Sequence, residues 1–418
     1  MKILISACHF TPDNIGVGKF SGEMAEWLAS RGHEVRAVVG APFYPHWKIL
    51  DGYSGARYLR EKVRGVDVVR CPIYVPRTQS GLKRLLQYTV LALTASPVLL
   101  FWAVRWKPDI VWTVMPPLAG MPTALLAAKL AEAPAWLHVQ DFEIDAAFEL
   151  GLLRKPMLKR MFLGIERRLM SSFRVVSSIT PKMLAALRTK NVSTNSVLFP
   201  NWFDPNVIYP LPNADFLRES LGIPRTAFVA LYSGNLGEKQ GVDSLVDVAR
   251  HLSDNPDFIL IICGDGAGRA RLASASTDLS NIRLLPLQPA SLFNALLNMA
   301  DAHLLPQRSE VADLVMPSKL PGMLASGRPV IAGAKPNTQL AQEVEGCGVV
   351  VPPSDSAAMA DAIRKLMINT EERRELGERA AKRAIEHWSK DRILLVFEQH
   401  LKRLLAENAV LDLSLGET

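Results

Sequence analysis

Lysine stands beside glycine or serine in two short segments of the second half of the chain, a combination suited to phosphate binding. Residues 233–241 place Asn235 and Lys239 among three glycines after an apolar run. Residues 316–320 open a predicted helix with Pro317 and Ser318 in its first turn and Lys319 beside the serine. Glycine lets backbone N–H groups approach a phosphate, while a hydroxyl, an ammonium and the free N–H groups of a helix start supply donors and charge. We predict a phosphate-bearing ligand at the carboxyl edge of a parallel sheet, where such folds bind ligands.

A glycine-rich loop also follows the first apolar run. Gly16 and Gly18 precede a helix predicted over 19–31, so their N–H groups are candidates for phosphate contact; the alternative is a turn that serves geometry alone. A dinucleotide fingerprint would need a third glycine where Ser21 stands. Gly264 opens a similar run that fails at Arg269, which makes an NAD-dependent oxidoreductase the least favoured function.

Apolar runs of strand length alternate with segments of helix length along most of the chain. Such runs indicate parallel sheets covered on both faces. They fall into two series, which predicts an α/β fold of two doubly wound, Rossmann-like domains. The predicted strands of the first series are 2–8, 34–41, 66–71, 109–114, 134–139, 173–179 and 196–200, and those of the second are 228–232, 258–263, 281–286, 301–306, 329–332 and 348–352.

Prolines mark the boundary between the two series. Two prolines in residues 199–206 and two more in 209–212 give a stiff, extended connector. We place the N-terminal domain at 1–205 and the C-terminal domain at 206–388, and we expect a C-terminal helix, 389–418, to return to the N-terminal domain.

Charge is divided unequally between the halves of the chain. The 418 residues are 49% hydrophobic and 21% charged, as in globular proteins, with a formal net charge of +7. Residues 1–205 hold 26 Lys and Arg against 15 Asp and Glu, a net charge of +11, and the remainder carries −4. A basic half indicates an anionic partner: nucleic acid, a membrane surface or a phosphorylated substrate. Nucleic acid is disfavoured, since zinc-finger spacing, an RNA-binding signature and long basic runs are all missing from the sequence.

The number and spacing of the cysteines indicate the redox environment of the protein. The four cysteines are widely spaced and form no C-x-x-C pair, which excludes a disulfide scaffold and a zinc knuckle and favours a reducing environment. The first apolar run is too short for a signal-peptide core. We therefore expect a cytoplasmic protein.

Two segments of the basic half fit a membrane surface. Residues 85–104 carry no charge, and 152–169 interleave basic with apolar residues. The alternatives are a buried helix for the first segment and a solvated helix face for the second. Because an anionic surface attracts basic side chains at ~1 kcal/mol each, we predict peripheral association with the inner face of the plasma membrane. The predicted contacts are Arg154, Lys155, Lys159 and Arg160.

Taken in order, these motifs resemble family 4 glycosyltransferases of the GT-B fold over nearly the whole chain. The quoted segments are 16–18, 31–35, 200–201, 234–241, 264–266 and 325–330. Residues 138–143, 235–241 and 317–319 are more narrowly similar to the WcaI-type transferases of colanic acid and related exopolysaccharide synthesis. The resemblance implies two Rossmann-like domains facing a cleft, a nucleotide-sugar donor held by the C-terminal one, an acceptor held by the N-terminal one, and transfer with retention of configuration and no obligatory metal.

The resemblance also assigns roles residue by residue. The implied contacts with the donor diphosphate are Gly16, Gly18, Asn235, Lys239, Ser318 and Lys319. The implied neighbours of the nucleobase and ribose are Gly264, Gln288 and Asp313. Asn235 stands where many members have arginine. Two family glutamates are replaced here by Leu314 and Gly322, which leaves Asp313 as the nearest stand-in.

A polar cluster follows the predicted strand 134–139. His138, Asp141 and Glu143 are the candidate catalytic residues, because side chains leaving a buried strand there could orient an acceptor hydroxyl or stabilise positive charge on the sugar ring. A family histidine stands near this strand end, and both His138 and Asp141 fit that role. The alternative for Asp141 is a cap of the following helix. The sequence shows no metal-ligand cluster, so no metal cofactor is predicted.

Three functions follow from these residues. The leading one is transfer of a sugar from a nucleotide-diphosphate donor, such as GDP-fucose, GDP-mannose or a UDP-sugar, to a polyprenyl-diphosphate-linked acceptor in exopolysaccharide synthesis. The second is a GT-B sugar-nucleotide epimerase or phosphorylase, which would need no lipid acceptor. The third is a catalytically silent partner in a polysaccharide assembly complex, suggested by the two replaced glutamates.

Overall fold

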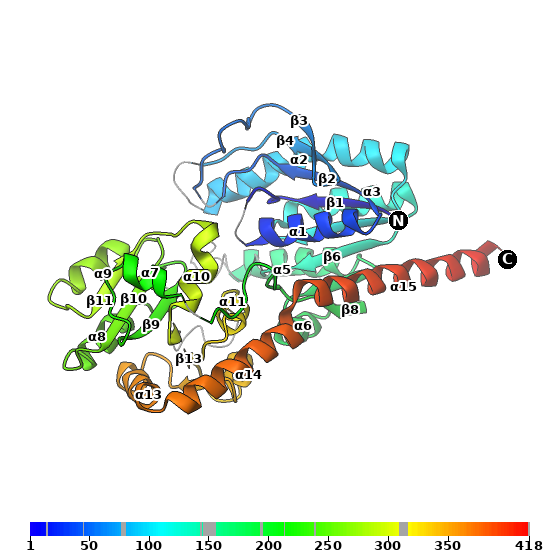
Figure 1. The fold of residues 1–418 in the computed structure, drawn as a ribbon. Coiled ribbons are helices and arrows are strands. Elements are labelled where there is room, and N and C mark those ends of the chain that lie inside the picture. The colour runs from blue at the N-terminus through cyan, green and yellow to red at the C-terminus, as the bar shows by residue number, and fades with distance from the viewer. Residues whose placement is uncertain are drawn as a thin grey trace. The chain divides into compact units, whose positions relative to one another are not determined.

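The computed structural model describes residues 1–13, 16–44, 46–76, 81–142, 144, 156–192, 195–212, 214–237, 240–308 and 317–416, with the side chains of 82, 156, 158, 159 and 409–416 outside the description. The chain divides into two compact units (Figure 1). The N-terminal unit comprises Met1–Asn201 and Ile393–Thr418, and the C-terminal unit comprises Trp202–Arg392. The boundaries expected from the sequence, near 205 and 389, fall within four residues of these.

An eight-stranded sheet in the order β3-β4-β2-β1-β5-β6-β7-β8 forms the centre of the N-terminal unit. All its neighbours are parallel except β3 and β4, and β1 pairs with β2 and β5 in the register Ile3↔Val35 and Ile3↔Ile110. The central strands are buried along their whole length, as expected for a sheet covered on both faces. The strands are β1 Lys2–Ala7, β2 Glu34–Gly40, β3 Leu59–Val63, β4 Val66–Cys71, β5 Ile110–Met115, β6 Ala135–Val139, β7 Val175–Ser178 and β8 Asn195–Leu198.

Helices cover both faces of this sheet. Side chains of α2, α3 and α6 pack into one core with alternate strand residues such as Leu4 and Leu137. Trp136, the neighbour of Leu137, points to the opposite face and meets Phe397 of α15 edge-on at 5.2 Å. The helices are α1 Val17–Ser30, α2 Gly81–Trp106, α3 Met121–Ala131, α5 Pro156–Met170, α6 Pro181–Thr189 and α15 Lys390–Gly416.

The helix α2 contains the uncharged segment 85–104. By length and composition alone, Lys83–Trp106 is apolar enough to cross a membrane, and 33% of its most apolar window is buried inside the protein. The side chains of Leu91 and Leu99 join the core, while those of Leu93 and Phe101 are exposed. The helix connects β4 to β5, two strands of the same sheet, and lies beside α3 (Figure 1).

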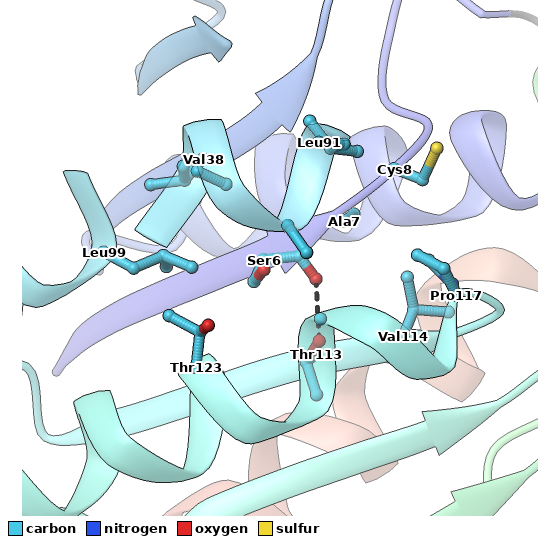
Figure 2. A pocket seen from close by; sticks show the side chains of 13 residues that line it. Ser6, Ala7, Cys8, Val38, Leu91, Leu99, Thr113, Val114, Pro117 and Thr123 are labelled. Carbon is cyan, nitrogen blue, oxygen red and sulfur yellow. Dashed lines mark hydrogen bonds between the residues drawn. The ribbon is translucent and has the colours of Figure 1, made fainter. Parts of the chain in front are cut away.

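A small cavity lies under α2 and α3, against β1 and β5 (Figure 2). Its volume is about 20 Å³, and Leu91 and Leu99 contribute to its apolar wall. Within it the Thr113 hydroxyl donates a hydrogen bond to the Ser6 carbonyl at 3.1 Å. A space of this size holds about one water molecule, so the cavity is a packing feature and no ligand site.

The C-terminal helix α15 is fixed to the N-terminal unit by a buried carboxylate. Glu398 is 2% exposed, and its oxygens accept from His33 Nε2 at 2.9 Å, Arg31 at 3.3 Å and Lys402 at 2.8 Å. Burial alone would raise the pKa of Glu398, but its bonds to Lys402 and His33 outweigh burial and lower the pKa to about 2.

A six-stranded sheet in the order β11-β10-β9-β12-β13-β14, parallel throughout, forms the C-terminal unit. The strands are β9 Phe228–Ser233, β10 Phe258–Cys263, β11 Ile282–Leu285, β12 Ala302–Leu305, β13 Val330–Gly333 and β14 Gly348–Val351. The helices are α7 Asp215–Ser220, α8 Ser244–His251, α9 Arg269–Ala275, α10 Phe293–Asn298, α11 Leu320–Ala325, α12 Gln339–Val344, α13 Ser356–Ile368 and α14 Thr370–Trp388. Both predicted doubly wound sheets are thus confirmed.

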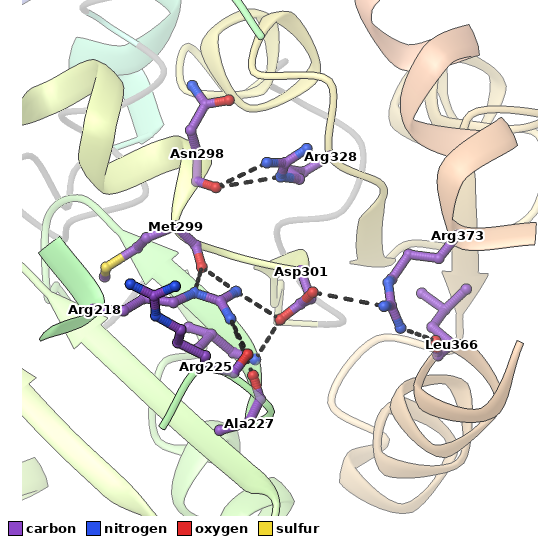
Figure 3. A network of polar contacts seen from close by, with 10 residues as sticks. Arg218, Arg225, Ala227, Asn298, Met299, Asp301, Arg328, Leu366 and Arg373 are labelled. Carbon is purple, nitrogen blue, oxygen red and sulfur yellow. Dashed lines mark hydrogen bonds and ion pairs between the residues drawn. The ribbon is translucent and has the colours of Figure 1, made fainter. Parts of the chain in front are cut away.

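A network around Asp301 ties helices to the amino end of β12 (Figure 3). Asp301 accepts from Arg218 and from the Val229 N–H, each at 2.8 Å, and lies 3.7 Å from Arg373. Arg328 donates to the carbonyl of Asn298, the last residue of α10. These arginines donate to carbonyls at or near the ends of the helices α10 and α13, on the side of the sheet where β12 begins.

Replacing Glu398 with Gln should destabilise the N-terminal unit by about 2 kcal/mol, because charge-assisted hydrogen bonds become neutral ones. The lowered pKa of Glu398 stabilises the fold above the ordinary value near 4.5, and this contribution is lost as the pH falls from there toward 2. The difference in unfolding free energy between wild type and Glu398→Gln should therefore shrink from pH 5 to pH 2 in denaturant titrations. Glu407→Gln, on the same helix and more exposed, is the control; an equal loss for both variants would contradict the prediction.

Candidate functional site

The loops after β9 and β10 are packed tightly at the carboxyl edge of the C-terminal sheet. A Cβ atom added to Gly264 would lie 1.9 Å from the carbonyl oxygen of Gly234, and one added to Gly234 would lie 2.9 Å from Lys319 Nζ. The φ angle of Gly234, 145°, is also one that side chains disfavour. Gly264, which the sequence predicted as a neighbour of the nucleobase, thus allows the loops after β9 and β10 to approach each other, and Gly234 leaves room for the ammonium of Lys319.

The ammonium of Lys319 rests on Tyr232, the penultimate residue of β9. Lys319 Nζ donates to the Tyr232 hydroxyl at 2.8 Å and lies 4.0 Å from the centre of its ring. The hydroxyl in turn donates to the Asn235 carbonyl at 2.7 Å. Burial lowers the pKa of Lys319 to about 7, because a desolvated ammonium with a neutral partner is disfavoured.

This lysine is prepared for an anion. Within the described part of the C-terminal unit, its hydrogen-bonding partner is the neutral Tyr232, so no carboxylate there competes for the charge. A phosphate oxygen would supply the missing counter-charge and favour the protonated form. The tyrosine is a site residue that the sequence interpretation missed; its only signal is a hydroxyl-bearing residue at the end of an otherwise apolar strand.

The other residues predicted to contact the donor differ in exposure, and two of them lie outside the described residues. Asn235 is exposed, and its side chain lies within 3.3 Å of the Cβ position of Gly237. Ser318 is also exposed, but the helix α11 begins only at Leu320, with Lys319 as its N-cap, so the prediction that Pro317 and Ser318 lie in its first turn is wrong. Gln288 donates to the Pro286 carbonyl of its own loop at 3.0 Å. Lys239 and Asp313 lie outside the described residues.

The predicted glycine loop of the N-terminal unit opens α1 at the carboxyl end of β1. Gly16 is the N-cap, with φ 63°; as a glycine it has no side chain to cap the helix, and the first turn holds no acidic residue. A Cβ atom on Gly18 would lie 2.6 Å from that of Asp13, so this glycine lets the helix approach the preceding loop.

His138 is enclosed within the N-terminal unit. It is 2% exposed, its Nδ1 lies 2.9 Å from the Ser177 hydroxyl, and its Nε2 lies 3.0 Å from the amide nitrogen of Gln140. Burial lowers the pKa of His138 to about 3, so the ring is neutral at physiological pH. Both ring nitrogens are thus used inside the fold.

The hydrogen bonds of His138 continue toward the strand ends. Gln140 exchanges hydrogen bonds with Asn201 at 3.0 and 3.2 Å, which links the residue after β6 to the end of the N-terminal segment. In this arrangement His138 positions Gln140. Asp141 is exposed beyond β6, whereas Glu143 lies outside the described residues, so the catalytic assignments of His138, Asp141 and Glu143 stay predictions.

The basic segment forms the amphipathic helix α5. Met157, Met161 and Ile165 are 85%, 50% and 43% exposed at a spacing of four residues, which makes an apolar stripe. Arg160 is exposed near this stripe, together with Arg167 and Arg168 at the end of the helix. Arg154 and Lys155 lie outside the described residues, as does the side chain of Lys159.

Comparison with known proteins gives the same order of domains along the chain. Residues 16–202 match the glycosyl transferase 4-like domain, and residues 213–383 match glycosyl transferases group 1. A putative colanic acid biosynthesis glycosyl transferase, WcaI of Escherichia coli K12, is 38% identical over 379 residues, covering 88% of this chain and 92% of that protein. Alpha-D-kanosaminyltransferase of Streptomyces kanamyceticus is 26% identical over 169 residues, 40% of this chain and 42% of that protein.

Solved structures share the fold. Sucrose-phosphate synthase from Thermosynechococcus elongatus superposes with a TM-score of 0.74 at 17% identity, covering 97% of this chain and 100% of that one. WaaG, a glycosyltransferase involved in lipopolysaccharide biosynthesis, gives a TM-score of 0.65 at 17% identity, with 91% and 95% covered.

The lowered pKa of Lys319 predicts how nucleoside diphosphate binding depends on pH. Below about pH 7 the ammonium is present, whereas above it the free protein must take up a proton on binding, so affinity should fall by up to about tenfold per pH unit. Calorimetry with GDP and UDP from pH 6 to pH 9, in buffers of different ionisation enthalpy, measures both the affinity and the proton uptake. Lys319→Met should bind weakly and lose this pH dependence; an unchanged pH profile in that variant would assign the titration to another group.

Proposed function

The chain belongs to glycosyltransferase family 4, and on that premise we propose that it moves a sugar from a nucleotide-diphosphate donor to a polyprenyl-diphosphate-linked acceptor. The observation that supports binding of the nucleotide-sugar donor is the desolvated ammonium of Lys319, which lies between two glycine loops. The 38% identical relative is named for colanic acid biosynthesis, which supports an acceptor in exopolysaccharide synthesis. The donor we propose is a GDP-sugar, such as GDP-fucose or GDP-mannose, or a UDP-sugar.

The chemistry we propose is electrostatic. As the bond between the sugar and the diphosphate breaks, negative charge grows on the leaving diphosphate, and Lys319 lies at the sheet edge where it can neutralise this charge. The ammonium sits in a preformed position, held by Tyr232, so little reorganisation is needed during the reaction. We propose that Lys319 works together with Asn235, Ser318 and Lys239, that the sugar keeps its anomeric configuration, and that no metal is obligatory.

We propose that the N-terminal unit docks on an anionic membrane surface, which would bring it to a lipid-linked acceptor. The support is the stripe of Met157, Met161 and Ile165 on α5 with arginines nearby, a pattern typical of interfacial helices. Exposed Leu93 and Phe101 make a second apolar strip on α2. The corresponding site of action is the inner face of the plasma membrane.

A donor panel tests the transferase proposal. Wild type should be stabilised against thermal unfolding by GDP or UDP and one of their sugars, and should transfer that sugar to a polyprenyl-diphosphate saccharide, equally with and without EDTA. Lys319→Met should reduce kcat/KM by about two to three orders of magnitude, the scale of losing one electrostatic donor. Lys365→Met, an exposed lysine at the end of α13, is the matched control.

The same panel separates the alternatives. Turnover of the nucleotide sugar without any acceptor would indicate an epimerase or phosphorylase. Donor binding without any turnover would indicate a catalytically silent partner, and near wild-type activity of Lys319→Met would contradict the assignment of the diphosphate to this lysine.

The docking proposal predicts salt-sensitive binding to anionic vesicles. Replacing Arg160, Arg167 and Arg168 with Ser should weaken binding to phosphatidylglycerol-containing vesicles by ~1 kcal/mol per arginine, measured by co-sedimentation. The control replaces three exposed arginines of the C-terminal unit, Arg225, Arg250 and Arg374, with Ser. Vesicle binding that is unchanged in the α5 variant would refute docking through this helix.

A further inference from the structure

A histidine–carboxylate pair follows β1 in the N-terminal unit and has no role in the function described so far. His9 Nδ1 lies 3.1 Å from Asp13 Oδ2, and the other oxygen of Asp13 accepts from the Tyr44 N–H at 3.3 Å. The carboxylate is 3% exposed, whereas 19% of the His9 side chain reaches solvent. The imidazole packs against Phe43 and Tyr44, with ring centres 4.8 and 5.5 Å apart. The ring is therefore fixed on one side and open on another.

The loop that carries this pair is held by side chains from other elements. Arg70, which is 1% exposed, donates to the Thr11 carbonyl, and the Asp13 N–H donates to the Phe10 carbonyl at 3.0 Å. The helix α1 approaches so closely that a Cβ atom on Gly18 would lie 3.3 Å from that of His9. Such support is typical of side chains whose orientation matters for binding.

The charge of His9 distinguishes it from His138. Burial alone would lower the pKa of His9, but the neighbouring Cys8 sulfur and the Asp13 carboxylate outweigh it and raise the pKa to about 10. Among the described residues, the titratable groups at the ring are Cys8 and Asp13 on its loop and Tyr44 after β2. On the adjoining helix α1, Lys19 and Glu23 pair with each other. The Asp13 carboxylate, 3.1 Å from Nδ1, thus favours the protonated imidazolium form of His9.

The second nitrogen of this imidazolium is available. Nδ1–H donates to Asp13, and Nε2 makes no hydrogen bond within the described residues, whereas both nitrogens of His138 are used inside the fold. Gly16, the N-cap of the neighbouring helix α1, has no side chain, and the first turn of this helix holds no acidic residue, so the helix start favours an anion. A histidine with a purely structural role in the loop would not require a second ring nitrogen that is able to donate to a ligand.

We propose that His9 is a second substrate-binding residue of the chain, donating from Nε2 to a phosphoryl oxygen of a diphosphate, with Asp13 as its positioning residue. The inference rests on the proposed function, which supplies two diphosphates, that of the nucleotide donor and that of the lipid-linked acceptor. The shared chemistry is a hydrogen bond from an imidazolium to a diphosphate oxygen.

Ring-nitrogen NMR of wild type provides a direct test that needs no turnover. The His9 signals should report an imidazolium at pH 7.5, and Nε2 should shift on addition of inorganic pyrophosphate, GDP or UDP. A shift with GDP or UDP alone would assign the donor diphosphate, while a shift with pyrophosphate alone would assign the acceptor diphosphate. Signals that none of the three ligands moves would overturn the proposal, even if wild type transfers sugar.

Kinetics of variants give the second test. His9→Gln should raise KM about tenfold for the substrate that carries the contacted diphosphate and leave the other KM unchanged. The control is His251→Gln, at an exposed histidine on α8, which should behave as wild type.

Asp13→Asn should lower the pKa of His9, so the activity of this variant relative to wild type should fall as the pH rises from 6 to 9. The ratio cancels the shared titration of Lys319. Unchanged KM values and a flat ratio would leave His9 as a structural residue; inactive wild type with the expected NMR shifts would instead refute the transferase function.

Discussion

The cost of keeping an ammonium out of water organises the carboxyl edge of the C-terminal sheet. Lys319 is half-buried, and Tyr232 offers it a ring face and one neutral oxygen, which compensate only part of the lost hydration. Glycine suits position 234 because its φ angle of 145° is one that side chains disfavour, and a Cβ atom there would also lie 2.9 Å from the ammonium. The tight loops and the lowered pKa of Lys319 are therefore consequences of one arrangement, and the proposed diphosphate would supply the missing counter-charge.

Two histidines of the N-terminal unit show how strongly surroundings decide function. His138 is enclosed by a serine, an amide and aromatic rings, so desolvation dominates and the ring stays neutral as part of the scaffold. His9 has a buried carboxylate on one nitrogen, so the charged form dominates despite burial. The sequence interpretation selected His138 because it stands near a strand end beside acidic residues. It passed over His9, whose partner four residues away is brought close only by the turn at Phe10–Asp13.

Local patterns predicted the scaffold well and the contacts poorly. Every strand expected from an apolar run is present within a few residues, since parallel strands buried on both faces have a strong signal. The strand β3 was missed because Leu59–Val63 is largely exposed and charged; the hairpin to β4 is set by positive φ angles at Arg64 and Gly65. The Lys319–Tyr232 pair spans 87 residues, and no local pattern encodes a contact of that separation.

Net charge and the proposed diphosphate site are separate properties of the chain. The C-terminal half carries −4, yet it holds Lys319, because a short-range contact in a desolvated site outweighs charges beyond a screening length of about 8 Å. In the basic half, Arg70 forms an internal hydrogen bond with Glu61, so its charge is compensated within the protein. The exposed arginines of α5 instead contribute to the positive electrostatic potential outside the protein. The excess of +11 therefore supports the proposed docking on an anionic surface, and the desolvated Lys319 and the Asp13-held His9 support the proposed binding of a diphosphate.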